Sequence, residues 1–168
     1  MEIRIYVANL AKYNEGVLQG EWITLPIDDE YLEKALERIL GDDEEIAIHD
    51  FEAPFRIHEY DSISRLNEIA EELENYTHLD DIILEGILEH TDSIDEALDI
   101  LRDSDFRTYH DCQTMEHVAM EIVEEAGYLD GAPEFLQRYF DYEAYGRDLE
   151  VNGYFYYLGG GVYLELIR

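Results

Sequence analysis

The chain begins with two short segments whose apolar side chains recur at the spacing of β-strands. Residues 3–10 alternate apolar and polar positions, and residues 18–25 form a second apolar run around Trp22. A period of two places the apolar side chains on one face of a strand. The polar loop at residues 12–16 therefore predicts a turn between two strands.

A helix and a third strand complete this first part of the chain. Pro26 ends the second strand, and apolar side chains then recur at helical spacing until Gly41. Aspartate is a favoured residue just before a helix, and glycine is common just past a helix end. Residues 45–51 predict a third strand. We expect residues 1–61 to form a small α+β domain.

The middle of the chain has the pattern of a helical bundle. Residues 63–73 form one apolar stripe at helical spacing, and residues 80–90 fit a second short helix. Ser93 and Glu96 have the spacing of a capping box, which opens a third helix. We expect residues 62–103 to form a small acidic helical domain.

The last part of the chain returns to a mixed pattern. Residues 106–110 predict a strand, residues 114–126 predict a helix, and Pro133 suits the first turn of another helix. Residues 154–166 contain two aromatic and apolar runs around three glycines, which predicts a β-hairpin. We expect residues 104–168 to form a second α+β domain, so the chain as a whole belongs to the α+β class.

Charge narrows the range of functions. The chain has 42 Asp and Glu against 11 Lys and Arg, a formal net charge of −31 over 168 residues, yet 46% of its residues are apolar. Ordinary hydrophobicity indicates a folded protein rather than a disordered one. Nucleic acids and anionic membranes are bound through clustered cations, so neither is an expected partner.

Targeting signals and disulfides are not expected. The chain has no run of about 18 apolar residues and no basic N-terminal segment followed by an apolar one. Cys112 is the sole cysteine, so an intramolecular disulfide is excluded. These features favour a cytoplasmic protein.

The acidic residues are concentrated in the centre of the chain. Residues 66–101 contain 12 carboxylates and no Lys or Arg. A charged run is usually a solvated helix face, but such faces normally mix the two signs. Glu68, Glu71 and Glu72 share a face with no cation between them, an arrangement that opposes helix stability by a few tenths of a kcal/mol per pair. Selection for something other than folding is therefore expected.

The spacing of these carboxylates suggests what they imitate. Side chains at i and i+4 are separated by about 6 Å along a helix axis, on the scale of the phosphates of a DNA strand. Two other interpretations stay open: an acidic protein-interaction domain, and a halophile-adapted structural protein without DNA mimicry. The chain has only two lysines, as halophilic proteins do, but its wealth of Tyr, Ile and Leu argues against that interpretation.

Catalytic and metal-binding patterns are weak. His110, Cys112 and His117 lie close in sequence and suggest a metal site or a thiol nucleophile, but a strand end leading into a helix cap explains them equally well. No calcium-loop spacing occurs, and the glycines at 159–161 precede a strand rather than a helix. We expect no catalytic residue, no metal and no cofactor.

Three segments resemble the ArdA antirestriction proteins of conjugative plasmids and transposons. They are IYVANLAKYNEG at 5–16, IHDFEAPFRIHEYDSISRLNE at 48–68 and YFDYEAYGRDL at 139–149. The resemblance implies an elongated, curved, three-module protein that forms a homodimer and imitates bent B-form DNA. It further implies a partner, the DNA-binding groove of type I restriction-modification enzymes, and no catalysis. An origin on a mobile genetic element is implied as well.

The expected functional residues fall into two sets. The resemblance places dimerisation in the last module, at Phe106, Thr108, His110, Asp111 and Cys112, and it places the family's antirestriction motif at residues 116–130. The acidic surface that would replace DNA phosphates is expected to comprise the carboxylates of Asp28, Asp29, Glu33, Glu37, Asp42, Asp43, Glu44, Glu68, Glu71, Glu72, Asp80, Asp81, Glu85, Glu89, Asp92, Asp95, Asp99, Glu121, Glu124 and Glu125.

Overall fold

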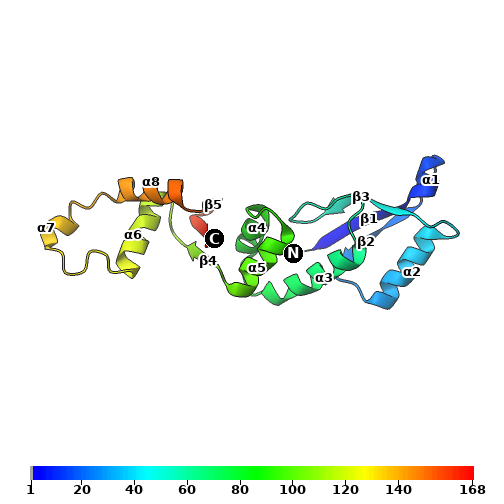
Figure 1. Ribbon diagram of the computed structural model, residues 1–168, viewed down its shortest axis with the longest axis horizontal. Helices are drawn as coiled ribbons and strands as arrows, with labels where there is room; N and C mark the ends of the chain where they lie inside the picture. The colour runs from blue at the N-terminus through cyan, green and yellow to red at the C-terminus, as the bar shows by residue number, and fades with distance from the viewer. Residues whose placement is uncertain (1) are drawn as a thin grey trace. The chain divides into compact units, whose positions relative to one another are not determined.

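The computed structural model describes residues 2–168 and confirms the α+β class. The chain divides into two compact units, the first ending at Asp81 and the second comprising Ile82–Arg168 (Figure 1). Each unit contains one three-stranded antiparallel sheet. The division into three domains at residues 61 and 103 is not tested by these contacts and stays a prediction. Every helix among the described residues is too short or too polar to cross a membrane.

The sheet of the first unit is built from the three predicted strands. β1 (Ile3–Asn9) lies between β2 (Gly20–Leu25) and β3 (Ile46–Glu52), and both pairings are antiparallel. Ile5 pairs with Ile23 on one side and with Phe51 on the other. The alternation of the sequence explains this sheet, because β1 buries Ile3, Ile5 and Val7 on one face.

Two longer helices cover this sheet, and both begin where the sequence places a cap. In α2 (Asp29–Leu40), the Asp28 side chain accepts a hydrogen bond from the Glu30 N–H. In α3 (Ile63–Leu73), the Ser62 side chain accepts one from the Arg65 N–H. A short 3-10 helix, η1 (Glu74–Tyr76), follows α3. The buried Asn67 of α3 bonds to both the N–H and the carbonyl of Ile27, which ties α3 to the chain between β2 and α2.

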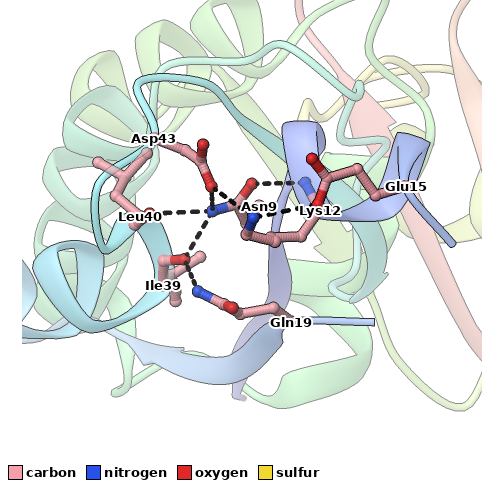
Figure 2. A network of polar contacts seen from close by, with 7 residues as sticks. All are labelled: Asn9, Lys12, Glu15, Gln19, Ile39, Leu40 and Asp43. Atoms are coloured by element: carbon pink, nitrogen blue, oxygen red, sulfur yellow. Dashed lines mark hydrogen bonds and ion pairs between the residues drawn. The ribbon is translucent and has the colours of Figure 1, made fainter. Parts of the chain in front are cut away.

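A network around Asn9 closes one end of the first unit (Figure 2). Asn9 is fully buried, and its side-chain oxygen accepts from the Lys12 N–H, which starts the short helix α1 (Leu10–Asn14). Its amide nitrogen lies within 3.1 Å of the carbonyls of Ile39 and Leu40 and of the Asp43 carboxylate. The last carbonyls of a helix have no partner within the helix. The Asn9 side chain, which comes from β1, donates hydrogen bonds to two such carbonyls at the end of α2. The prediction of a loop at residues 12–16 is therefore wrong for residues 12–14, which belong to α1.

The sheet of the second unit has the order β4-β6-β5. It contains β4 (Phe106–Tyr109), β5 (Phe155–Gly159) and β6 (Val162–Leu166). The last two strands form the predicted hairpin, with positive φ angles at Gly159, Gly160 and Gly161 in its turn. A conformation with positive φ is readily adopted by glycine, which explains the three consecutive glycines.

Two predicted helices precede this sheet in the chain, and the first of them contacts the hairpin. They are α4, which starts at the unit boundary (Asp81–Glu89), and α5 (Ile94–Asp103). A Cβ added to Gly86 of α4 would lie 2.7 Å from the Leu158 side chain, so the helix approaches the hairpin closely there. The ring of His90 stacks on that of Tyr156 at 4.0 Å between centroids and 7° between planes.

The segment after the predicted helix α6 (Met115–Glu125) differs from expectation. The helix expected from Pro133 is only α7 (Glu134–Gln137), and a longer helix that the sequence pattern missed, α8 (Tyr142–Asn152), follows it. A new N-cap explains the change, because the Asp141 side chain accepts from the Ala144 N–H.

Several aromatic side chains around α7 lie on the surface. Phe135 is 61% exposed and Tyr139 is 84% exposed. The close crossing in this region is instead made by a glycine of α8, because a Cβ on Gly146 would lie 2.6 Å from the Met115 carbonyl. Tyr128, Phe135 and Tyr139 are thus exposed between α6 and α8, whereas Phe140 is half-buried and its ring contacts that of Tyr142.

Candidate functional site

The expected acidic surface is largely exposed in both units. All but three of its carboxylate residues are exposed, and the exceptions, Asp43, Glu72 and Glu121, are half-buried. In the first unit, the residues lie on α2, in the turn after α2, on α3 and around the start of α4. In the second unit, they lie on α4, in the loop after it, on α5 and on α6. The polar faces of amphipathic helices account for this exposure.

Two of the half-buried carboxylates serve contacts within the chain. The Asp43 carboxylate accepts from the Asn9 side chain at 3.1 Å and lies 3.7 Å from the Lys12 ammonium nitrogen (Figure 2). The Glu121 carboxylate accepts from the Cys112 thiol at 3.4 Å. These two groups are less available to a partner than the exposed members of the surface.

The expectation that nothing compensates the charges of Glu68, Glu71 and Glu72 is wrong, as two of them show. Arg65 forms an ion pair with Glu68 at 3.2 Å, three residues along α3. The Asn67 amide donates to the Glu71 carboxylate at 3.4 Å. The sequence argument looked for cations only after residue 65 and so overlooked the preceding turn of the same helix.

Three of the helices that carry the expected acidic surface have carboxylates and no cation in their last turn. The last turn of α3 contains Glu71 and Glu72, that of α4 ends at Glu89, and that of α6 contains the pair Glu124 and Glu125; none contains a basic residue. The C-terminus of a helix carries partial negative charge, so a carboxylate there opposes the dipole by about 0.3–1 kcal/mol. Local helix stability therefore does not explain these residues.

Helix α4 presents its carboxylates as a ladder of like charges. Asp81, Glu85 and Glu89 are exposed and follow one another at intervals of four residues. Neighbours at this interval lie on the same face, about 6 Å apart along the axis. The helix contains no Lys or Arg. A surface of this kind attracts a strongly basic partner.

Strand β4, where the dimer contact is expected, lies at an edge of its sheet. It pairs with β6 alone in the sheet order, and the Ile167 N–H donates to the Asp105 carbonyl beside it. Bonded positions alternate along an antiparallel strand, so Phe106 and Thr108 direct their backbone groups to the open side. An unpaired edge is a template for pairing with another chain.

The remaining expected interface residues differ in exposure. His110 and Asp111 are exposed, and Asp111 has a φ of 58°. Cys112 is only 1% exposed and packs in the core of the second unit beside Met115 and Val118. Its side chain is therefore directed inward rather than toward the open side of β4.

The three residues that suggested thiol or metal chemistry are used in other ways. Burial, helped by the adjacent Glu121 carboxylate, raises the pKa of the Cys112 thiol to about 11. At neutral pH this group is a thiol and not the reactive thiolate. The His117 ring nitrogen Nδ1 accepts from the Gln113 N–H, and His110 is exposed. Within residues 2–168, no group of three or more potential metal ligands is found.

One groove was missed by the sequence argument. Its volume is about 460 Å³, and it lies beside β2 and α2, where its lining includes Trp22 and Tyr31. Its two cations are already neutralised, because Lys34 pairs with Glu30 at 2.5 Å and Arg38 pairs with Glu21 at 2.7 Å. The spacing of Glu30 and Lys34 was the sequence signal for this balanced face.

Comparison with known proteins gives one result that covers nearly the whole chain. Residues 5–164 match the family model described as antirestriction protein (ArdA). No curated protein matches the chain.

Proposed function

The chain belongs to the ArdA family of antirestriction proteins, and on this premise we propose that it blocks type I restriction-modification enzymes. It does so by occupying their DNA-binding groove as a mimic of bent B-form DNA. The exposed carboxylates take the places of phosphates. They displace the counterions of a basic groove as DNA does.

The observation that carries this proposal is the placement of charge against helix stability. The carboxylates of Glu89, Glu124 and Glu125 lie at helix C-termini, where folding alone favours cations. Such residues are expected where a partner supplies the compensating positive charge. A fixed array on packed helices also avoids the cost of bending, which real DNA must meet.

The active form in this proposal is a homodimer that pairs through β4. The open backbone groups of Phe106 and Thr108 support this arrangement, because two copies can extend the sheet across a two-fold axis. One chain of net charge −31 corresponds at most to about 15 base pairs at one charge per about 1.7 Å. Two chains double the matched length to about 30 base pairs.

Inhibition by occupancy requires no reaction in this protein. The Cys112 thiol is buried and protonated at neutral pH, and the exposed carboxylates lie on helix surfaces. The protein is accordingly proposed to act stoichiometrically on its target, without a cofactor and without turnover. Its proposed location is the cytoplasm, where restriction enzymes meet incoming DNA.

Protection of unmodified DNA tests this function. A type I enzyme is incubated with unmethylated plasmid and increasing amounts of the protein, and the cleaved fraction is measured. The expected result is loss of cleavage at amounts stoichiometric with the enzyme. Full cleavage at a large excess would overturn the proposal. Folding that begins only in molar salt, together with full cleavage, would favour a halophile-adapted structural protein instead.

A further inference from the structure

Arg168 contacts three separate segments of the second unit. Its Nη2 atom donates to the His90 carbonyl at 3.0 Å, and its Nε atom lies 3.2 Å from the Glu96 carboxylate. Its guanidinium lies over the Tyr154 ring, 4.7 Å from the centroid. The side chains of this ion pair are 23% and 31% exposed, whereas those of Arg147 and Glu143 are 67% and 72% exposed.

These contacts lie where α4 ends and α5 begins. His90 directly follows the last residue of α4, so its carbonyl belongs to a helix end that attracts a cation. Glu96 lies in the first turn of α5, where its carboxylate also accepts from the Asp92 N–H. One guanidinium therefore holds the facing ends of two acidic helices.

The backbone just before Arg168 is anchored to the sheet. The N–H of Ile167, the residue before Arg168, donates to the Asp105 carbonyl at 2.9 Å, beside the β4–β6 pairing. The stacking of His90 on Tyr156 adds a second contact between the helix junction and β5. Besides the buried apolar side chains of α4 and α5, Arg168 thus adds three contacts at the junction of the two helices.

We propose that Arg168 is a positioning residue for inhibition, which holds the α4 and α5 carboxylates in the geometry that the target groove reads. The inference rests on the proposed function. A mimic of fixed geometry loses affinity when its charges no longer engage together, because ordering them on binding then costs free energy. Arg168 thus supports an acidic surface although it is itself a cation.

The sign of the effect separates positioning from charge. Arg168→Ala removes a positive charge, so an account based on net charge alone predicts unchanged or slightly tighter inhibition. Positioning predicts weaker inhibition, by about tenfold. Arg168→Lys keeps the charge but loses the planar fork that reaches two acceptors at once, so it too is expected to weaken inhibition.

Arg147→Ala is the matched control. It makes the same change in net charge, and it removes one exposed ion pair with Glu143, 3.8 Å long, on α8. Exposed pairs of this kind contribute little to stability. Inhibition by this variant is expected to equal that of the wild type.

The experiment measures competition with unmodified DNA for a type I modification complex, using wild type, Arg168→Ala, Arg168→Lys and Arg147→Ala over a salt series. Circular dichroism establishes the folded fraction of each. The slope of log affinity against log salt counts the ionic contacts made together, and a loss of stability alone leaves it unchanged. Both Arg168 variants are expected to show weaker competition and a shallower slope.

The outcomes distinguish the two proposals. The positioning role is overturned if both Arg168 variants compete as strongly as the wild type and with the same salt slope. The proposed function then still stands. Weakening by Arg168→Ala with full rescue by Arg168→Lys also overturns it, because charge alone then suffices. No competition by the wild type overturns the proposed function, and this inference falls with it.

Discussion

Helices α2 and α4 are both acidic, but α2 contains cations that form ion pairs and α4 contains none. In α2, Lys34 pairs with Glu30 one turn earlier, and Arg38 lies in the last turn and reaches Glu21 on β2. In α4, carboxylates follow at intervals of four residues, and the helix ends on Glu89 with no cation. The first pattern stabilises a helix by known increments, and the second opposes it.

This difference between α2 and α4 separates the charges that stabilise the folded chain from those that do not. The paired charges of α2 are accounted for within the chain, as on an ordinary solvated helix. Glu89 of α4 and the carboxylates that end α6 oppose the dipoles of their own helices, and a basic partner would make them favourable. Net charge alone would have treated both helices as equivalent.

A substitution that prevents the proposed dimer from forming should have the largest effect on inhibition. Thr108→Pro on β4 removes an N–H that faces the open side of the sheet, so the fold of one chain is retained while pairing with a second copy is blocked. Two linked binding surfaces gain about 100-fold or more over one. We expect a monomer by analytical ultracentrifugation and inhibition about 100-fold weaker. Thr108→Ala keeps the N–H and should remain dimeric; a dimeric Thr108→Pro variant would contradict the interface.

Charge reversal on α4 should raise the free energy of unfolding and weaken inhibition. Glu85→Lys with Glu89→Lys places cations near the C-terminus and relieves repulsion, so the free energy of unfolding should rise by about 0.5–1 kcal/mol. Inhibition should weaken by about tenfold, because two groups that we propose to face the groove become repulsive. Denaturant titration and DNA competition measure the two effects. A variant that is both more stable and fully inhibitory would break the distinction between α2 and α4.

One acid of α6, Glu121, serves the fold, because its carboxylate accepts from the Cys112 thiol. The native pKa of the thiol, about 11, lies above its ordinary 9.0, so the native state holds the proton more tightly than the unfolded state. The resulting stability is complete below pH 9 and is lost as the pH rises toward 11. By pH 10, the free energy of unfolding should fall by about 1 kcal/mol. Cys112→Ala should flatten this dependence in urea titrations; an equal slope in both proteins would contradict it.

Salt should stabilise the chain through its unbalanced helices. Screening reduces repulsion between like charges, so the melting temperature should rise by several degrees between low and moderate salt. Calorimetry at a series of salt concentrations measures the shift. A flat melting temperature would mean that the carboxylates are paired throughout, as Glu30 is on α2.

Single neutral substitutions should have the smallest effects. Glu30→Gln on α2 loses the Lys34 pair and should lower the free energy of unfolding by at most about 0.5 kcal/mol, whereas Glu89→Gln on α4 should raise it slightly. Neither should change inhibition more than about twofold, because many weak contacts share the binding. Loss of inhibition from one such change among residues 68–99 would indicate a localised site.

Local signals in the sequence were sufficient for most of the fold. The caps at Asp28, Ser62 and Ser93 all make the expected hydrogen bonds to backbone N–H groups, and the apolar periods locate the helices that follow them. Helix α1 was missed because Asn9, which caps it, is held by carbonyls about 30 residues away. Helix α8 was missed because it lacks a buried apolar stripe: its buried residue is Gly146.

The acidic surface was predictable in outline and not in detail. Amphipathic spacing indicates which carboxylates face solvent, and most of them do. The inward roles of Asp43 and Glu121 depend on partners that tertiary packing brings together. The Arg168 contact with His90 spans 78 positions, a separation at which no local pattern operates.

The most direct test of DNA mimicry is competition at the DNA-binding groove itself. Binding of labelled unmodified DNA by a type I modification complex is measured with and without this protein at constant salt. The account predicts that DNA is displaced at stoichiometric amounts, with an apparent DNA affinity that falls in proportion to added protein. Undiminished DNA binding in the presence of excess protein would contradict it.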